Sequence, residues 1–134
     1  MEIIAHRINS INKLKNLNTN FGVEVDIRAN EKDLIIGHDP FSDYINFKDW
    51  LSFYKHGTLI LNVKENDLEN KVKSLDNSGA DYIHIDVMDG HYVDNTSFGV
   101  ETIKKIRKVT SKILDVHLMV KPVQHHIDDY IEAG

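Results

Sequence analysis

Short apolar segments of strand length recur along the chain, and stretches with helical spacing separate most of them. The apolar segments are residues 2–6, 22–27, 58–63, 81–87 and 113–120. Their length and their content of Val, Ile and Leu are typical of buried strands. An additional apolar segment at 34–36 follows residues 22–27 closely, and we expect it to form a short strand or hairpin that returns toward the site end of the sheet.

Two stretches between the apolar segments have clear helical spacing. Residues 67–78 place apolar side chains on one face before Gly79, and residues 99–109 do the same with Ile103 and Ile106. Strands that alternate with helices favour a parallel sheet. An antiparallel sheet with one solvated face remains an alternative.

The strand segments carry chemistry on one of their two faces, because side chains alternate along a strand. In residues 83–88 the polar face holds His84, Asp86 and Met88, and in residues 114–119 it holds Asp115, His117 and Met119. Glu24 and Asp26 share a face of their segment in the same way. The polar residues lie toward the carboxyl ends of the strands, where α/β sheets and barrels build their active sites. We therefore expect the polar face to line a pocket and the apolar face to pack under helices.

Composition narrows the possible functions. The chain has 134 residues, a formal net charge of −5 and no cysteine. An acidic chain without a basic cluster argues against binding to nucleic acid or to a membrane surface, and no apolar run approaches the roughly 18 residues of a membrane span. The first ten residues do not read as a signal peptide. We expect a cytoplasmic protein in which any metal is bound by His, Asp and Glu.

His84, Asp86 and His117 form a candidate three-ligand set for a divalent metal, drawn from two neighbouring strands. Imidazole and carboxylate suit Zn²⁺, Mn²⁺ or Fe²⁺, and three protein ligands leave positions for substrate oxygens. The alternative from the residues alone is a group of hydrogen-bonded interior polar side chains.

Residues 79–134 resemble the early part of the ribulose-phosphate 3-epimerases, which are TIM-barrel enzymes. The resemblance lies in the order H-x-D-x-M-D-G at 84–90, then Asn95, then D-x-H-L-M at 115–119. It implies that His84, Asp86 and His117 bind the metal and that Asp86 is also an acid-base residue. Met88 and Met119 would cover the reacting carbons of a sugar phosphate, whose epimerisation at C3 needs proton removal beside a carbonyl and stabilisation of an enediolate.

The same resemblance leaves part of the family's site unmatched. The family has a second Asp on a later strand, a phosphate loop beyond it and a Ser on its first strand, and this sequence shows none of the three. We therefore expect epimerisation by this chain to be impaired.

Residues 1–64 resemble a different TIM-barrel family, the glycerophosphodiester phosphodiesterases and related proteins encoded with capsule-biosynthesis enzymes. The pattern is His-Arg on the first strand, Glu-x-Asp on the second and His-Asp after the hairpin. It implies a phosphodiesterase-like hydrolase site made of His6, Arg7, Glu24, Asp26 and His38. His6 and His38 would be the acid-base pair, Arg7 a phosphate clamp, and the two carboxylates metal ligands.

The sequence departs from that second family at two places. Ile8 stands where the family prefers Gly, and Asn62-Val63-Lys64 replaces a Glu-x-Lys motif, which removes an anionic metal ligand. The alternative is a degenerate site kept only as scaffold.

Together the two resemblances predict an α/β fold, a partial TIM-type (β/α) barrel of about five parallel strands with intervening helices that does not close as a single chain. We expect one domain over residues 1–134, with phosphodiesterase-like units at 1–64 and epimerase-like units at 65–134, and all seven candidate His, Asp and Glu residues on one face. Open sheet edges predict self-association or a complementing chain. A hybrid barrel fragment without catalysis is a third interpretation.

Overall fold

The computed structural model describes residues 1–30, 33–40, 43–65 and 76–134. Its elements, in chain order, are β1 (Ile4–Ala5), α1 (Ile11–Asn16), β2 (Gly22–Ala29), β3 (Leu34–Ile36), β4 (Ile45–Asn46), α2 (Phe47–Leu51), β5 (Leu59–Val63), β6 (Tyr82–Met88), α4 (Val100–Arg107), β7 (Ile113–Met119), the 3-10 turn η2 (Val123–His125) and α5 (Ile127–Ala133). The helix expected at 67–78 falls largely outside the described residues.

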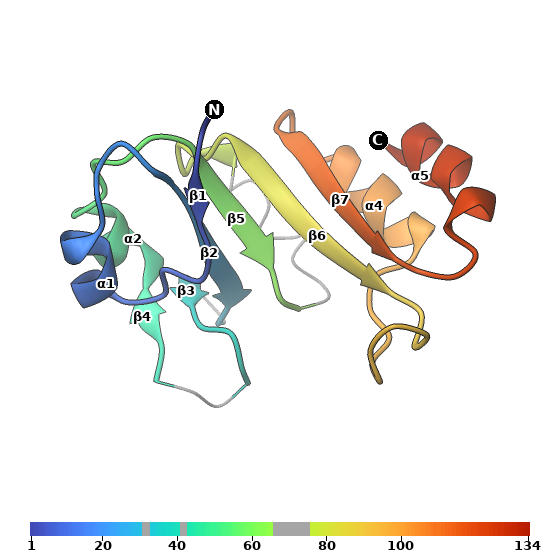
Figure 1. Cartoon of the computed structure of the whole chain (residues 1–134), viewed down its shortest axis with the longest axis horizontal. Helices are drawn as coiled ribbons and strands as arrows, with labels where there is room; N and C mark the ends of the chain where they lie inside the picture. The colour runs from blue at the N-terminus through green and yellow to red at the C-terminus, as the bar shows by residue number, and fades with distance from the viewer. Residues whose placement is uncertain (31–32, 41–42, 66–75) are drawn as a thin grey trace.

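The strands form one seven-stranded sheet that is mostly parallel and does not close (Figure 1). β1, β2, β5, β6 and β7 pair side by side in parallel. β3 and β4 form an antiparallel hairpin on β2. The five parallel strands, the short strand at residues 34–36 and the open barrel-type architecture expected from the sequence are thus confirmed, whereas β4 is too short to have left an apolar pattern.

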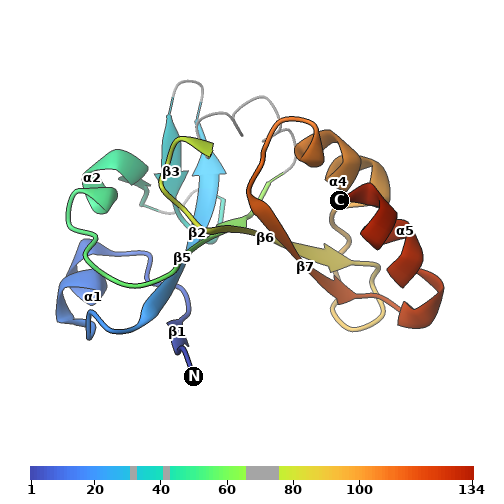
Figure 2. The same cartoon turned by 90° about the horizontal axis from the view of Figure 1, so that it is seen from above.

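The core lies on the face of the sheet opposite to the polar one. Val25, Leu61, Ile83 and Ile85 are fully buried, because their strands alternate apolar and polar positions and the apolar side chains point toward the helices. Figure 2 shows α4 and α5 beside β6 and β7, and α1 and α2 at the other end of the sheet. Burial of the apolar face fixes the strand register, since a slip of one residue would exchange the two faces.

Local signals in the sequence set the helices that flank the sheet. The Ser10 hydroxyl caps α1 by accepting a hydrogen bond from the Lys13 amide, and the Asn46 side chain caps α2 in the same way. Trp50 of α2 is fully buried and donates its indole N–H to the Ile8 carbonyl. Trp50 is therefore part of the core. None of the described helices has the length and apolar character needed to cross a membrane.

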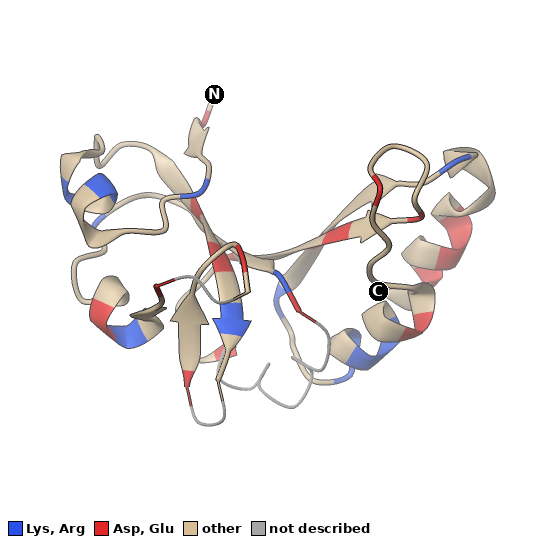
Figure 3. Cartoon of the chain, turned by 90° about the horizontal axis from the view of Figure 1, so that it is seen from below, with Lys and Arg blue, Asp and Glu red and all other residues tan. Residues whose placement is uncertain are grey.

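The polar face is exposed at β7, where the His117 side chain is 57% exposed, but it is buried at β2, where Asp26 is fully buried. On the face drawn in Figure 3, acidic and basic positions are interspersed. Near the amino ends of the strands, Ile4, Ile60, Tyr82 and Ile113 line an open hollow, and Ile113 is 58% exposed. Among the described residues, β7 pairs only with β6, so its other edge presents unpaired backbone groups.

We expect the free edge of β7 to cause concentration-dependent self-association in sedimentation velocity experiments. Replacing Ile113 with Lys adds a charge on this edge strand and should shift the equilibrium toward monomer, because charged side chains block strand addition. Ile131→Lys on α5 is the control, since Ile131 is 71% exposed but lies away from the sheet. A monomer at all concentrations, or a loss of association caused only by Ile131→Lys, would contradict this prediction.

Candidate metal and proton-transfer site

Two polar rows cross the parallel strands, one near the middle of β6 and β7 and the other two residues closer to their carboxyl ends. In the first row the backbone register aligns Asp26, Asn62, His84 and Asp115 on four adjacent strands. In the second row Asp86 of β6 is aligned with His117 of β7. Because strand residues two apart share a face, His84 and Asp86 point to the same side of β6 and meet His117 there. The sequence alternation therefore produces a compact polar cluster.

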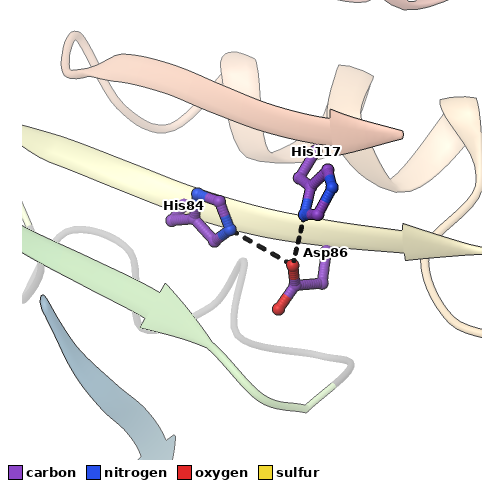
Figure 4. A group of neighbouring side chains, drawn as sticks. All are labelled: His84, Asp86 and His117. Atoms are coloured by element: carbon purple, nitrogen blue, oxygen red, sulfur yellow. Dashed lines mark hydrogen bonds and ion pairs between the residues drawn. The ribbon is translucent and has the colours of Figure 1, made fainter. Parts of the chain in front are cut away.

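His84, Asp86 and His117 come together around one carboxylate oxygen (Figure 4). The Asp86 Oδ1 atom lies 3.2 Å from His84 Nε2 and 3.3 Å from His117 Nδ1. One potential ligand atom from each residue lies within 4.8 Å of the others, a spacing that a metal ion can occupy. Two imidazoles and a carboxylate are donors that suit Zn²⁺, Mn²⁺ or Fe²⁺. In chemistry and spacing, these residues fit a divalent cation.

Asp115 sets the orientation of the His84 ring. Its Oδ2 atom lies 2.7 Å from His84 Nδ1, so that this nitrogen carries the proton that it donates to the carboxylate. His84 Nε2 is then the nitrogen that faces Asp86 and is available for a ligand. A carboxylate behind a histidine commonly fixes the ring and its tautomer in metal sites. Sequence analysis placed Asp115 on the polar face but assigned it no role, because the contact depends on the register between β6 and β7.

The second oxygen of Asp86 faces a lysine that sequence analysis did not include in the site. Lys64, which follows β5, donates a hydrogen bond of 2.9 Å from its Nζ to Asp86 Oδ2, and the same Nζ lies 3.4 Å from Asp26 Oδ1. The Asn62 side chain also donates to Asp86. Lys64 therefore joins the carboxylate of the N-terminal half of the chain to that of the C-terminal half. The position of Lys64 two residues after Asn62 was the available signal.

The proton equilibria of His84 and Asp86 are coupled through their contact. The hydrogen bond to Asp86 raises the pKa of His84 to about 9, with a further contribution from Asp115 and partial opposition from burial. The His84 hydrogen bond, reinforced by the Lys64 ammonium, holds the pKa of Asp86 far below its ordinary range although burial opposes this shift. Without a bound metal, the site at neutral pH therefore contains a charged imidazolium and an ionised carboxylate.

The loop after β6 fixes the end of that strand. Ser97 donates its hydroxyl to the Asp86 carbonyl at 2.6 Å and accepts the Met88 amide at 2.9 Å. Asp89 begins a turn in which Gly90 has a φ of 89°, a left-handed conformation that glycine adopts without strain. The Asp89 carboxylate also accepts the Lys121 amide. Ser97 is a positioning contact that sequence analysis missed.

Met88 and Met119 are register partners at the carboxyl ends of β6 and β7. Both side chains are half-buried, and Met88 lines a cleft that also contains Asp86. This arrangement is compatible with the expected role of the two thioethers in covering a substrate, a role that stays a prediction.

The N-terminal candidate residues have separate surroundings. His6 Nδ1 lies 3.4 Å from Glu24 Oε2, and the Arg7 amide donates to the same carboxylate. Arg7 itself has a positive φ of 54° and an exposed side chain. Fully buried Asp26 accepts a hydrogen bond from Asn9 and faces Lys64. Among the described residues, the only group of three or more His, Asp or Glu side chains close enough to share a metal ion is the one around Asp86.

His38 borders the same cleft as Asp86 of the metal-type cluster, the group formed by His84, Asp86 and His117. Its ring contacts the Asp39 carboxylate at 2.8 Å, and its carbonyl accepts two hydrogen bonds from the Arg28 guanidinium. The cleft has a volume of about 370 Å³ and is bordered by Arg28, His38, Lys64 and Asp86. Of the seven residues expected on one face, His84, Asp86 and His117 form one cluster, Asp26 is joined to it through Lys64, and His38 borders the same cleft as Asp86. His6 and Glu24 form a separate pair.

The raised pKa of His84 makes the stability of the metal-free protein depend on pH. A histidine whose pKa rises on folding stabilises the fold fully below its ordinary value of 6.5, and that contribution disappears as the pH rises through about 9. We expect the free energy of unfolding, measured by urea denaturation, to fall over this range more in the wild type than in His84→Gln. NMR titration of the His84 ring should give a midpoint near 9, and Asp86→Asn should lower it. A midpoint at the ordinary value would contradict the pairing.

Comparison with known proteins agrees with the resemblance found in the second half of the chain. A sequence model of the ribulose-phosphate 3-epimerase family matches residues 57–134. The match begins just before β5 and includes β6 and β7, so it contains His84, Asp86 and His117. Residues 1–56, with most of the phosphodiesterase-like pattern, lie outside it.

Individual relatives give the same picture. The chain is 41% identical over 75 residues to the ribulose-phosphate 3-epimerase of Rhodobacter capsulatus, which is 56% of this chain and 33% of that protein. It is 45% identical over 67 residues to the Bacillus subtilis enzyme, or 50% of this chain and 31% of that protein. Identity to the chloroplastic ribulose-5-phosphate-3-epimerase of Arabidopsis thaliana is 40% over 75 residues, or 56% of this chain and 27% of that protein.

The aligned region thus spans about a third or less of the length of each of these relatives. On the side of this chain, however, the family model covers more than half of the 134 residues and all three residues of the metal-type cluster. This chain therefore belongs to the ribulose-phosphate 3-epimerase family.

Proposed function

We propose that this protein binds a divalent metal and a ketose phosphate and transfers the proton on the carbon beside the carbonyl, which is the chemistry of 3-epimerisation. The observation that carries the proposal is the Asp86 carboxylate held between two imidazoles at the carboxyl end of a barrel-type sheet. Family membership supports the same reaction class. Ribulose 5-phosphate is the substrate that the family name suggests.

The three donors divide the work of holding the metal. His84 would bind through Nε2, because Asp115 engages Nδ1, and His117 would bind through Nδ1, the nitrogen that faces Asp86. Asp86 would contribute Oδ1, the oxygen between the two rings. A bound divalent ion supplies Lewis-acid stabilisation of the negative charge that develops on the substrate oxygens. The donor set suits Zn²⁺, Mn²⁺ or Fe²⁺.

Asp86 is also the group that we propose for proton removal. It is ionised at neutral pH and therefore in the form that accepts a proton. The hydrogen bonds that lower its pKa also make it a weak base, and proton transfer is most efficient when the pKa of the base lies near the working pH. The Lys64 ammonium also opposes protonation of Asp86, because it favours the ionised carboxylate.

Inversion at C3 also needs a proton donor on the opposite face of the enediolate. Among the described residues, Asp86 is the only carboxylate in the three-ligand cluster. We therefore propose that proton exchange by this chain is faster than epimerisation, and that complete turnover is impaired.

The phosphodiesterase-like interpretation is less well supported. Asp26 already faces Lys64 and Asn9, and Glu24 already accepts the Arg7 amide beside His6. These contacts engage the two carboxylates that this interpretation requires as metal ligands. Cleavage of a glycerophosphodiester by the chain would support the phosphodiesterase-like interpretation. A chain that retains no metal and acts on neither ribulose 5-phosphate nor a glycerophosphodiester would be a non-catalytic hybrid barrel.

Deuterium exchange tests the proposed reaction directly. In deuterated water with Mn²⁺ or Zn²⁺, the chain should exchange the C3 hydrogen of ribulose 5-phosphate for deuterium. Mass spectrometry of the recovered sugar measures this exchange. Asp86→Asn should slow exchange about 100-fold or more, because the general base is lost. Asp128→Asn on exposed α5 is a control of the same chemistry and should exchange like the wild type. Equal exchange by wild type and Asp86→Asn would refute the assignment of the base.

Metal affinity tests the orienting role of Asp115. We expect Asp115→Ala to weaken Zn²⁺ binding about 10- to 100-fold, because the ring of His84 loses the partner that fixes its tautomer. The Zn²⁺ affinity of Asp115→Asn, whose amide oxygen still accepts a hydrogen bond, should lie between that of the wild type and that of Asp115→Ala. Competition with a chromophoric chelator measures the affinities. Asp129→Ala on α5 should leave them unchanged, and an Asp115→Ala variant that binds as tightly as the wild type would rule out this role.

A further inference from the structure

The cleft beside the metal-type cluster contains two cations that the proposed chemistry does not use. It lies between the segment that follows β3 and the loop before α4, with Arg28 and Lys64 on one side and Thr96 and Ser97 on the other. Asp86 and Met88 also border it. A molecule in this cleft can therefore contact Asp86 together with the adjacent Lys64, and also Arg28.

Arg28 is held in place by the backbone of the following hairpin. Its Nε and Nη2 atoms donate to the His38 carbonyl at 3.2 and 2.8 Å, and its Nη1 lies 3.5 Å from Glu65 Oε2. A guanidinium carries five N–H groups in a fixed plane. The three contacts that Arg28 makes with described residues orient this plane without engaging all five N–H groups. The side chain is only 13% exposed, which makes it a preorganised anion-binding group rather than a freely moving surface arginine.

The acidic groups in the cleft are already engaged. Asp86 accepts hydrogen bonds from Lys64 and Asn62, Glu65 accepts the Ala29 amide at 2.6 Å, and Asp39 faces the ring of His38. A divalent ion at the Asp86 cluster adds positive charge at the same end. The cleft of the metal-loaded protein therefore favours an anion.

The position of Arg28 in the sheet points to the same ligand. β5 is the first strand within the family match, and β2 pairs with it in parallel on the side away from β6. In a closed eight-stranded barrel, the neighbour of the first strand on that side is the last one. Loops after the last two barrel strands frequently bind phosphate. Arg28 lies near the carboxyl end of β2, the strand that pairs with β5 on that side, although β2 lies outside the family match.

We propose that Arg28 and Lys64 form a subsite for the phosphate of a phosphomonoester, and that the N-terminal segment thereby supplies a function of the site from outside the family match. The identity of the ligand as a ketose phosphate rests on the proposed function, whereas the anion subsite does not. The guanidinium binds the phosphate oxygens, and the Lys64 ammonium lies between the phosphate and the Asp86 carboxylate.

Phosphate binding to the full chain tests the subsite without turnover. Inorganic phosphate is titrated into ¹⁵N-labelled protein loaded with Zn²⁺, and the Arg28 Nε–H resonance is followed by NMR. We expect this resonance to shift saturably. Arg28→Met should weaken phosphate binding at least tenfold, Arg28→Lys less, and Lys13→Met on exposed α1, which removes the same charge elsewhere, should have no effect. The same titration with ribulose 5-phosphate and with unphosphorylated ribulose should show tighter binding of the phosphate ester.

The outcomes separate the subsite from the reaction. An unshifted Arg28 resonance in the wild type, or equal phosphate affinity of wild type and Arg28→Met, would overturn the subsite even if C3 exchange is observed. Arg28-dependent phosphate binding without any C3 exchange would retain the subsite and refute the proposed function. If Arg28→Met does not fold, the titration of the wild-type Arg28 Nε–H resonance and the phosphate affinity of Arg28→Lys test the subsite instead.

Discussion

The sharing of one carboxylate, Asp86, among three positively charged or protonatable neighbours organises the polar face of this protein. One oxygen faces two imidazoles and the other faces an ammonium and an amide. A half-buried carboxylate is costly without such partners, so each neighbour stabilises its ionised form. The same contacts define the geometry that a metal needs, and they also weaken the carboxylate as a base. In the proposed function, metal binding and proton transfer are therefore opposing demands on the Asp86 side chain.

Lys64 makes this site different from a metal cluster that stands alone. It contacts Asp26, which is contributed by β2, and Asp86, which is contributed by β6, across the intervening strand β5. The N-terminal segment, which lies outside the family match, and the matched segment thus meet in an ion-pair network. Barrel units are geometrically alike, which explains how strands outside and inside the match extend one parallel sheet with a continuous apolar layer on the far face.

Much of this arrangement could be predicted from the sequence because strand periodicity is simple. Alternation placed His84 and Asp86 on one face, and the same alternation in the next parallel strand brought His117 beside them. The roles of Lys64 and Asp115 could not be predicted in this way, since each depends on the register between neighbouring strands. β4 has only two residues and no pattern of its own, and the hydroxyl contacts of Ser97 depend on a loop conformation that composition does not specify.

The location of Asp115 and His117 on an edge strand links the metal site to the mechanics of the sheet. β7 has a single neighbour among the described strands, so its outer backbone amides lack the second ladder that protects an interior strand, and local opening there needs less free energy than in β2 or β5. Fraying of β7 would remove one candidate ligand and the support of another at once. Binding of an ion to this candidate site and the closed conformation of β7 are consequently linked thermodynamically. A change that favours the closed conformation raises the affinity for the ion, and a bound ion favours the closed conformation by the same coupling free energy.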